Sequence, residues 1–322
     1  MATILDPELE TFVSESESFS GPETNDFSVI REGYNRMTRY FQAPHPEGLQ
    51  IENGAIEGLE GDIPVRVYRP AALASPCPTL LYFHGGGWVV GNLDSHDSIT
   101  AELAKEANIQ VIAVDYRLAP EHLFPAACDD SWTVLQSLLH APELFSIDAK
   151  RLLVGGDSAG ANLAAAITLL LRTQNAANKS SDSTAYLKGQ LLIYPALSSE
   201  NLESRKTQAK APLFTTEEMD IYLQYYLGRA VTEEDKKDLR LFPAQAQDFS
   251  NLPPAFLTAA ELDPLADDVP DYANKLVSAG TKADYLVEPG LMHGWLRARH
   301  SSPRAAAAFA RIVEALKKLA ET

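Results

Sequence analysis

A serine in a tight turn motif is the first candidate for chemistry in this chain. Ser158 stands in the sequence GDSAG at 156–160, between a predicted strand over 151–155 and a predicted helix over 159–172. A nucleophile at such a sharp strand-to-helix turn has a strained backbone, and glycines two residues before and after it leave room for neighbouring backbone. The pattern therefore predicts a serine nucleophile, and the alternative is a tight turn with a chance serine.

Three consecutive glycines form a second candidate group. Gly85, Gly86 and Gly87 lie in the sequence HGGGW at 84–88, directly after a predicted strand over 79–83. Glycine-rich backbone can turn N–H groups into a cavity, and acyl transfer needs such donors where the carbonyl oxygen becomes negative. A phosphate cradle is the alternative, but neither GxxxxGK[ST] nor GxGxxG spacing occurs here. His84 is interpreted as structural, fixing the loop through hydrogen bonds.

A histidine base and an acid would complete the machinery of a serine nucleophile. On a sheet of this kind the chain order is Ser, acid, His, and only His293 and His300 follow Ser158. His293 is the preferred base because it lies in a loop directly after a predicted strand, where such a sheet presents its chemistry. His300 is expected to be solvated. Asp263, which follows another predicted strand, is the preferred acid, and Glu261 is the fallback.

The elements that must position these residues alternate between short apolar strands and helices, which predicts a mostly parallel sheet covered by helices. The predicted strands are 63–68, 79–83, 110–115, 151–155, 190–194, 255–259 and 284–288. The predicted helices are 96–107, 126–139, 159–172, 267–279 and a last helix that begins at 302–303. Asp267 and Asp268 are interpreted as charges at a helix N-terminus.

Two regions interrupt this alternation. Residues 1–45, with a predicted helix over 27–41, and residues 198–240, with a predicted helix over 216–227, carry no core strand. Insertions between core elements often form lids, so we predict that the two regions form a small helical cap. The core is then 46–197 and 241–322. Residues 174–185 are polar and are predicted to be an exposed loop.

Composition excludes several classes of function. The 322 residues include 27 Lys and Arg against 44 Asp and Glu, a net charge of −17, which argues against a nucleic-acid binder and against docking on anionic membranes. The longest apolar run, 163–171, is too short to span a bilayer. The N-terminus has no signal-peptide pattern, so a cytoplasmic location is expected. Cys77 and Cys128 are interpreted as core residues rather than a disulfide or a zinc site.

The acidity is concentrated at the N-terminus, since residues 1–30 hold seven Asp and Glu and no Lys or Arg. A solvated face that aids solubility is the simpler interpretation. The sharper hypothesis is that this segment covers a pocket and repels anionic substrates.

Taken together, the motifs resemble the hormone-sensitive-lipase family of α/β-hydrolases, and most closely its microbial carboxylesterases with a GDSAG turn. The resemblance spans roughly residues 60–300. It rests on HGGG at 84–87, DYRLAPEH at 115–122 with FPA at 124–126, GDSAG at 156–160, QLLIYP at 190–195, LPPA at 252–255, DPL at 263–265 and HGW at 293–295.

This resemblance implies an α/β-hydrolase fold and a serine carboxylesterase acting on short- to medium-chain acyl esters without a cofactor or metal. It implies Ser158 as nucleophile, His293 as base and Asp263 as orienting acid. The implied oxyanion donors are the N–H groups of residues 85–87 and of Ala159. It further implies that Glu121 holds loops near the site.

A substrate pocket is expected beside Trp88, Tyr194 and Trp295. Trp295 stands where Phe is common in the family and is expected to narrow the pocket. The expected partner is a small ester, and a homodimer is possible. Two alternatives stay open: an acyltransferase or amidase with the same triad, and a non-catalytic ligand receptor on this fold, which the complete triad disfavours.

Overall fold

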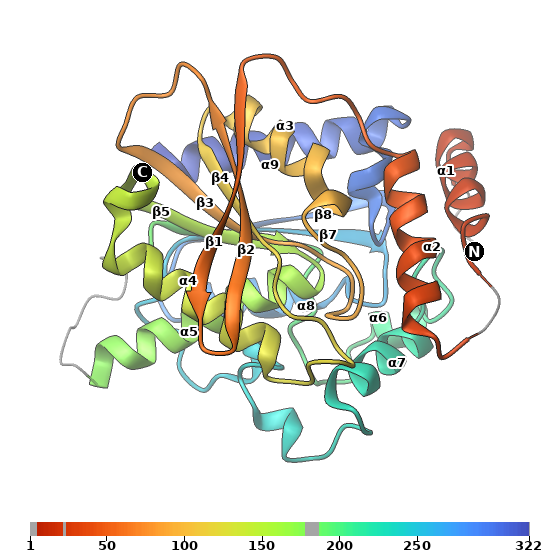
Figure 1. Ribbon diagram of the computed structural model, residues 1–322. Helices are drawn as coiled ribbons and strands as arrows, with labels where there is room; N and C mark the ends of the chain where they lie inside the picture. Colours follow the sequence, from red (N-terminus) through yellow and green to blue (C-terminus); the bar gives the residue numbers. More distant parts are fainter. Residues whose placement is uncertain (1–4, 22–23, 178–186, 322) are drawn as a thin grey trace.

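The central feature of the computed structural model is one eight-stranded sheet with the strand order β1-β2-β4-β3-β5-β6-β7-β8 (Figure 1). The structure describes residues 5–21, 24–177 and 187–321. β2 pairs antiparallel with β1 and β4, and the strands from β4 through β8 pair in parallel. The strands are β1 (Leu49–Gly58), β2 (Gly61–Pro70), β3 (Cys77–Phe83), β4 (Gln110–Val114), β5 (Ile147–Asp157), β6 (Gly189–Ile193), β7 (Ala255–Leu262) and β8 (Ala283–Met292).

Helices cover both faces of this sheet, which confirms the predicted fold class. Buried side chains of α3 and α9 belong to one core cluster, and those of α4, α5 and α8 belong to the other. Figure 1 shows these helices around the sheet. The longer helices are α1 (Pro7–Glu17), α2 (Phe27–Tyr40), α3 (Asp97–Ala107), α4 (Ala126–His140), α5 (Ala159–Ala177), α7 (Thr216–Leu227), α8 (Asp268–Ser278) and α9 (Pro303–Glu321). Every residue of β3, β4 and β6 is buried, as expected for strands covered on both faces.

Two of the longer elements, β1 and α1, were missing from the sequence prediction. β1 is an edge strand that exposes most of its residues, so it lacks the apolar pattern of the inner strands. α1 is short and acidic, and it buries few side chains, chiefly Leu9 and Phe12. The predicted loop over 174–185 is wrong at its start, because residues 174–177 continue α5. The rest of that prediction lies outside the described residues.

The N-terminal helices and residues 198–240, here called the inserted segment, lie on the same side of the molecule. In Figure 1, α2 lies beside α6 (Ser204–Thr207) and α7. α7 begins at a capping box, in which the Thr215 side chain and Glu218 satisfy each other's backbone N–H groups, and it ends at Gly228 with φ +68°. Both groups of helices line one cavity above the Ser158 turn. Across the described ranges, no helix is long and apolar enough to cross a membrane.

Candidate active site

Ser158, His293 and Asp263 meet at the carboxyl edge of the parallel strands. Ser158 Oγ lies 2.8 Å from His293 Nε2, and His293 Nδ1 lies 2.7 Å from Asp263 Oδ2. Asp263 is fully buried, and its Oδ1 accepts a 2.8 Å hydrogen bond from the Leu265 N–H. A carboxylate at Nδ1 favours the tautomer with its proton on that nitrogen, which leaves Nε2 free to accept the serine proton.

The turn at Ser158 is strained in the way the motif predicts. Ser158 has φ +55°, an unusual value for a residue with a side chain, and its N–H donates to the carbonyl of Ile193 at 2.9 Å. A Cβ at Gly156 would lie 2.3 Å from the Phe83 carbonyl oxygen, and one at Gly160 would lie 2.0 Å from the same atom. Both glycines are therefore needed for the close approach of β3 to the turn.

The glycine loop divides into two functional parts. Gly86 and Gly87 have φ +123° and +59° and line the cavity, as does Ala159 at the start of α5. The Gly85 N–H instead donates to Asp157 Oδ1 at 3.0 Å. The prediction that Gly85 is an oxyanion donor is therefore wrong, because its hydrogen is already used inside the protein.

His84 has the structural position predicted for it. The side chain is buried, its Nδ1 lies 2.8 Å from the Gly85 carbonyl oxygen, and its ring stacks on Tyr116 with centroids 4.3 Å apart. Burial, together with the neighbouring His96, lowers the pKa of His84 to about 3, so the ring is neutral at physiological pH. A neutral ring at this place stabilises the glycine loop.

His300 and Glu261, the alternative base and acid, lie outside the hydrogen-bonded line that joins the three preferred residues. His300 Nε2 is 2.9 Å from Glu102 Oε1, and its side chain is half exposed. Glu261 is exposed and accepts the Gly290 N–H at 2.7 Å. The preference for His293 and Asp263 therefore agrees with the observed contacts.

Asp267 and Asp268 do more than place charge at a helix end. Asp267 Oδ2 accepts the Ser204 N–H at 2.8 Å, and Asp268 forms a fully buried ion pair with Arg205 at 2.6 Å. Arg205 also donates to the carbonyl of Pro264, the residue after the triad acid. The inserted segment is thus fastened to the loop that carries Asp263, a link that no sequence motif indicated.

The cavity at the triad has a volume of about 1300 Å³. Trp88 and Tyr194 line it, and the Tyr194 ring lies 4.8 Å from the His293 ring. Trp295 does not line it, because its side chain is fully buried behind Tyr194 with ring centroids 6.1 Å apart. The expectation that Trp295 narrows the pocket is therefore wrong.

Two aromatic residues of the inserted segment reach the site, one at His293 and the other at the glycine loop. Phe214 stacks on His293 with centroids 4.5 Å apart, and the ring of Tyr222 lies so close to Gly87 that a Cβ there would be 2.2 Å from Cδ1. Sequence reasoning predicted an aromatic helix over 216–227 but not these contacts. The only signal was the concentration of aromatic residues there.

The acidic N-terminal segment also contributes to the cavity wall, with apolar side chains such as Phe12 and Ile30 and with polar ones such as Ser16 and Thr24. Of its acidic residues that the structure describes, Glu17 lines the cavity. The repulsion of anionic substrates stays a hypothesis. Among the described residues, no group of three or more His, Cys, Asp and Glu side chains could hold a metal ion.

Comparison with known proteins places this geometry in a family. Residues 80–297 match the model of a family with the alpha/beta hydrolase fold. This chain belongs to that family. It is 38% identical to carboxylesterase NlhH of Mycobacterium tuberculosis over 274 residues, covering 84% of this chain and 83% of the relative. It is also 38% identical to an ethyl acetate hydrolase of Pseudomonas putida, covering 80% and 78%.

Solved structures agree with this membership. The ester hydrolase EH1AB1 from the metagenome of Lake Arreo superimposes with a TM-score of 0.90 at 35% identity, covering 99% of this chain and all of the other. A hyperthermophilic esterase of the archaeon Pyrobaculum calidifontis gives a TM-score of 0.89 at 30% identity, with the same coverage. The predicted resemblance and the predicted class, a carboxylic ester hydrolase of the α/β-hydrolase fold, are confirmed.

Proposed function

We propose that this protein is a serine carboxylesterase in which Ser158, His293 and Asp263 act as nucleophile, base and orienting acid. The observation that carries the proposal is the unbroken hydrogen-bonded line from Asp263 through His293 to Ser158, with contacts of 2.7 and 2.8 Å, at the floor of one cavity. Such a line is the arrangement by which a neutral imidazole makes a serine hydroxyl nucleophilic.

Acylation starts when Ser158 Oγ attacks the ester carbonyl and its proton passes to His293 Nε2. The buried carboxylate of Asp263 stabilises the imidazolium that forms. The N–H groups of Gly86, Gly87 and Ala159 receive the oxyanion, and each such donor contributes about 10²–10³ in rate. His293 then protonates the leaving alcohol, and the acyl group stays on the serine.

Deacylation repeats these steps with water as the nucleophile. His293 takes a proton from the water, which attacks the acyl carbonyl, and the tetrahedral intermediate expels Ser158 Oγ as the proton returns to it. Phe214, stacked on His293, limits access of bulk solvent to the imidazole face. An acyltransferase would differ only in the attacking group, so product analysis distinguishes it from an esterase.

The substrates that this site favours are esters of short to medium acyl chains. Residues 1–45 and 198–240 act as a helical cap, because α1, α2, α6 and α7 all contribute to the wall of the cavity. The rings of Phe214 and Tyr222 occupy space directly above the triad and the glycine loop. The names of two relatives, an ethyl acetate hydrolase and an acetyl esterase, are consistent with small acyl groups.

Replacement of the nucleophile is the direct test. Ser158→Ala should lower kcat for p-nitrophenyl butyrate by about 10⁴–10⁶-fold, because no other group can form the acyl-enzyme. Labelling with a fluorophosphonate should disappear in the same variant, while circular dichroism and the Tm stay close to wild type. A series of p-nitrophenyl esters should peak at short to medium chains. Normal turnover by Ser158→Ala would refute the triad, and a preference for long-chain emulsified fats would refute the substrate class.

A further inference from the structure

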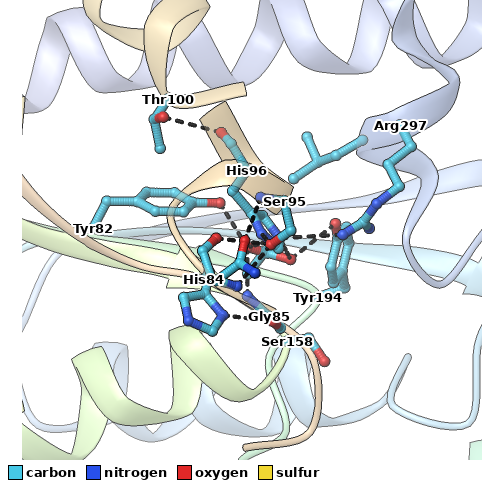
Figure 2. Close-up of polar contacts among 12 residues, drawn as sticks. Tyr82, His84, Gly85, Ser95, His96, Thr100, Ser158, Tyr194 and Arg297 are labelled. Carbon is cyan, nitrogen blue, oxygen red and sulfur yellow. Dashed lines mark hydrogen bonds and ion pairs between the residues drawn. The ribbon is translucent and has the colours of Figure 1, made fainter. Parts of the chain in front are cut away.

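A buried polar cluster lies beneath the nucleophile turn and has no role in the mechanism above. Its centre is Asp157, the residue before Ser158, which is 2% exposed. Three of its neighbours, Tyr82, Gly85 and Tyr194, are labelled in Figure 2. Asp157 Oδ1 accepts hydrogen bonds from the Tyr82 hydroxyl at 2.7 Å and from the Gly85 N–H at 3.0 Å. The Tyr194 hydroxyl lies 3.5 Å from Oδ2. A carboxylate thus connects the nucleophile turn to the start of the glycine loop.

Asp157 and Gly85 fit each other closely. A Cβ at position 85 would lie 2.4 Å from Asp157 Oδ2, so the carboxylate occupies the space that the missing side chain leaves. Gly86 and Gly87, the next two residues, carry the proposed oxyanion donors. The position of Asp157 therefore sets the direction from which these N–H groups enter the cavity.

A carboxylate this deeply buried needs a positive charge nearby. His96 Nε2 lies 3.4 Å from both oxygens of Asp157, but burial lowers the pKa of His96, so the ring is neutral near pH 7. Arg297, in the 3-10 helix η6 (Trp295–His300), places its Nη2 3.4 Å from His96 Nε2. Although burial works to raise the pKa of Asp157, the charges of His96 and Arg297 and the bond from Tyr82 hold it well below its usual value. Near neutral pH, where His96 is neutral, the positive charge that balances Asp157 comes from Arg297.

Arg297 is itself unusual among the buried cations. Its side chain is 9% exposed, and within the described ranges its Nε has no hydrogen-bond partner. Its Nη2 donates to the Tyr34 hydroxyl at 2.5 Å, and the guanidinium lies 5.2 Å from the centre of that ring. Tyr34 belongs to α2, so the N-terminal region contacts the cluster directly. Figure 2 shows Arg297 above Tyr194 and Ser158.

We propose that Arg297 is a positioning residue whose buried guanidinium balances the charge of Asp157. Asp157 can then hold the glycine loop in its oxyanion-binding geometry. Through its hydrogen bond to Arg297, Tyr34 makes the docking of α2 part of this arrangement. The role rests on the proposed function, because it acts on the donors that the esterase mechanism uses. In this role Arg297 does not contact the substrate.

The central experiment compares Arg297→Met, Arg297→Lys and the control Arg299→Met in the full chain. Arg299 lies in the same 3-10 helix and is also buried, but it pairs with Glu102 at 2.6 Å, outside the cluster. Arg297→Met should lower kcat for p-nitrophenyl butyrate about 10- to 100-fold with KM within twofold of wild type, because the donors are misplaced for the transition state. Arg297→Lys should recover most of this loss. Arg299→Met should lower the Tm without changing kcat of the folded protein.

Two further readouts separate positioning from a general packing defect. A trifluoromethyl ketone, which forms an oxyanion on the serine, should bind at least tenfold more weakly to Arg297→Met, whereas the corresponding secondary alcohol should bind unchanged. Amide hydrogen exchange of a peptide covering residues 84–91 should be at least tenfold faster, because Asp157 without its balancing charge no longer holds the Gly85 N–H. Unchanged kcat, ketone affinity and exchange in a folded Arg297→Met protein would overturn the proposal.

Charge balance is tested by a double variant. Asp157→Asn removes the carboxylate, so Arg297→Met should cost less than threefold in kcat on that background. If Arg297→Met alone does not fold, Asp157→Asn should restore folding to the double variant, and failure to do so would contradict the charge role.

The part played by Tyr34 is tested separately. Tyr34→Phe should reduce kcat two- to fivefold in wild type and should cause no further reduction in Arg297→Met. Multiplicative effects of the two substitutions would refute the coupling. Serine-independent turnover in Ser158→Ala would instead refute the proposed function and leave the exchange results standing.

Discussion

The two groups of helices above the triad are attached to the sheet in different ways. The inserted segment around α6 is fastened by the Arg205–Asp268 ion pair, whose side chains are 4% and 0% exposed. The N-terminal helix α2 is fastened by Arg31, which bonds to Glu121 in a pair whose side chains are 26% and 53% exposed. Removing one partner of a buried ion pair strongly destabilises the folded state, whereas an exposed pair contributes little to stability. Judged by these ion pairs alone, the inserted segment is held more firmly than α2, which Tyr34 also ties to the buried Arg297.

The attachments also reach different parts of the active site. Arg205 bonds to the carbonyl of Pro264, next to the triad acid. Arg31 bonds to the carbonyl of Val89 at 2.8 Å, and the Val89 N–H donates to the Gly86 carbonyl at 3.1 Å. The inserted segment therefore supports the acid, and α2 supports the glycine loop.

The largest effect in this comparison is expected from Arg205→Met. The change leaves Asp268 buried without its partner, and we expect a loss of about 3–5 kcal/mol in the free energy of unfolding at pH 8, measured by urea denaturation. Burial already raises the pKa of Asp268 to about 6 despite Arg205. The carboxyl group can therefore take up a proton, so the loss should be smaller at pH 5.

A matched control for that experiment is the neighbouring residue. Lys206 forms an exposed pair with Glu203 at 3.8 Å, so Lys206→Met should change the stability by less than about 0.5 kcal/mol. Equal effects of the two substitutions would show that the inserted segment is not held by the buried pair.

An intermediate effect is expected from Arg31→Met. The variant loses its bonds to the carbonyls of Val89 and Ala119 as well as to Glu121, and we expect a cost of about 1–2 kcal/mol in stability. We also expect a three- to tenfold lower kcat/KM, measured with p-nitrophenyl butyrate, because the glycine loop loses a support. Glu121→Gln removes only the exposed partner and should reduce kcat/KM less than twofold. If both variants behave alike, the backbone bonds of Arg31 do not support the loop.

The smallest effect concerns Asp115, which lies beside the docking face of α2 in a second pocket that Arg31 and Asn35 also line. Burial and the neighbouring Asp94 raise the pKa of Asp115 to about 6, against the opposing effect of Arg66. The unfolded chain loses this proton near pH 4, so the contribution of Asp115 to stability falls as the pH rises from about 4 to about 6. Asp115→Asn should therefore be more stable than wild type above pH 6 and equal to it below pH 4.

This difference is best measured as the pH dependence of Tm. At pH 8 we expect Asp115→Asn to have a Tm about 2–4 °C above wild type, with the difference vanishing near pH 4. Glu57→Gln, at an exposed position on β1, should leave the Tm unchanged at both pH values. A gain for Asp115→Asn that does not depend on pH would exclude the titration as its cause.

Prediction from sequence succeeded where local rules decide the outcome. The apolar runs at 79–83 and 190–194 form buried strands because only a sheet covered on both faces can bury them. The glycines flanking Ser158 stand where a Cβ would clash with the Phe83 carbonyl oxygen. Prediction failed at β1, whose exposed residues show no such pattern. It also failed at Gly85 and Trp295, where membership of a motif did not tell which groups face the cavity.

The sequence alone determined the fold class and singled out Ser158, His293 and Asp263 as the proposed catalytic residues, because chain order and strand ends restrict the candidates to a few residues. Only the tertiary structure decided which N–H groups remain available, since the Gly85 hydrogen is taken by Asp157, a residue 72 positions away. It also decided that Arg205 and Arg297 support the site. Charges that pair across such separations leave no periodic or local trace, because their energy depends on burial and distance, which folding alone creates.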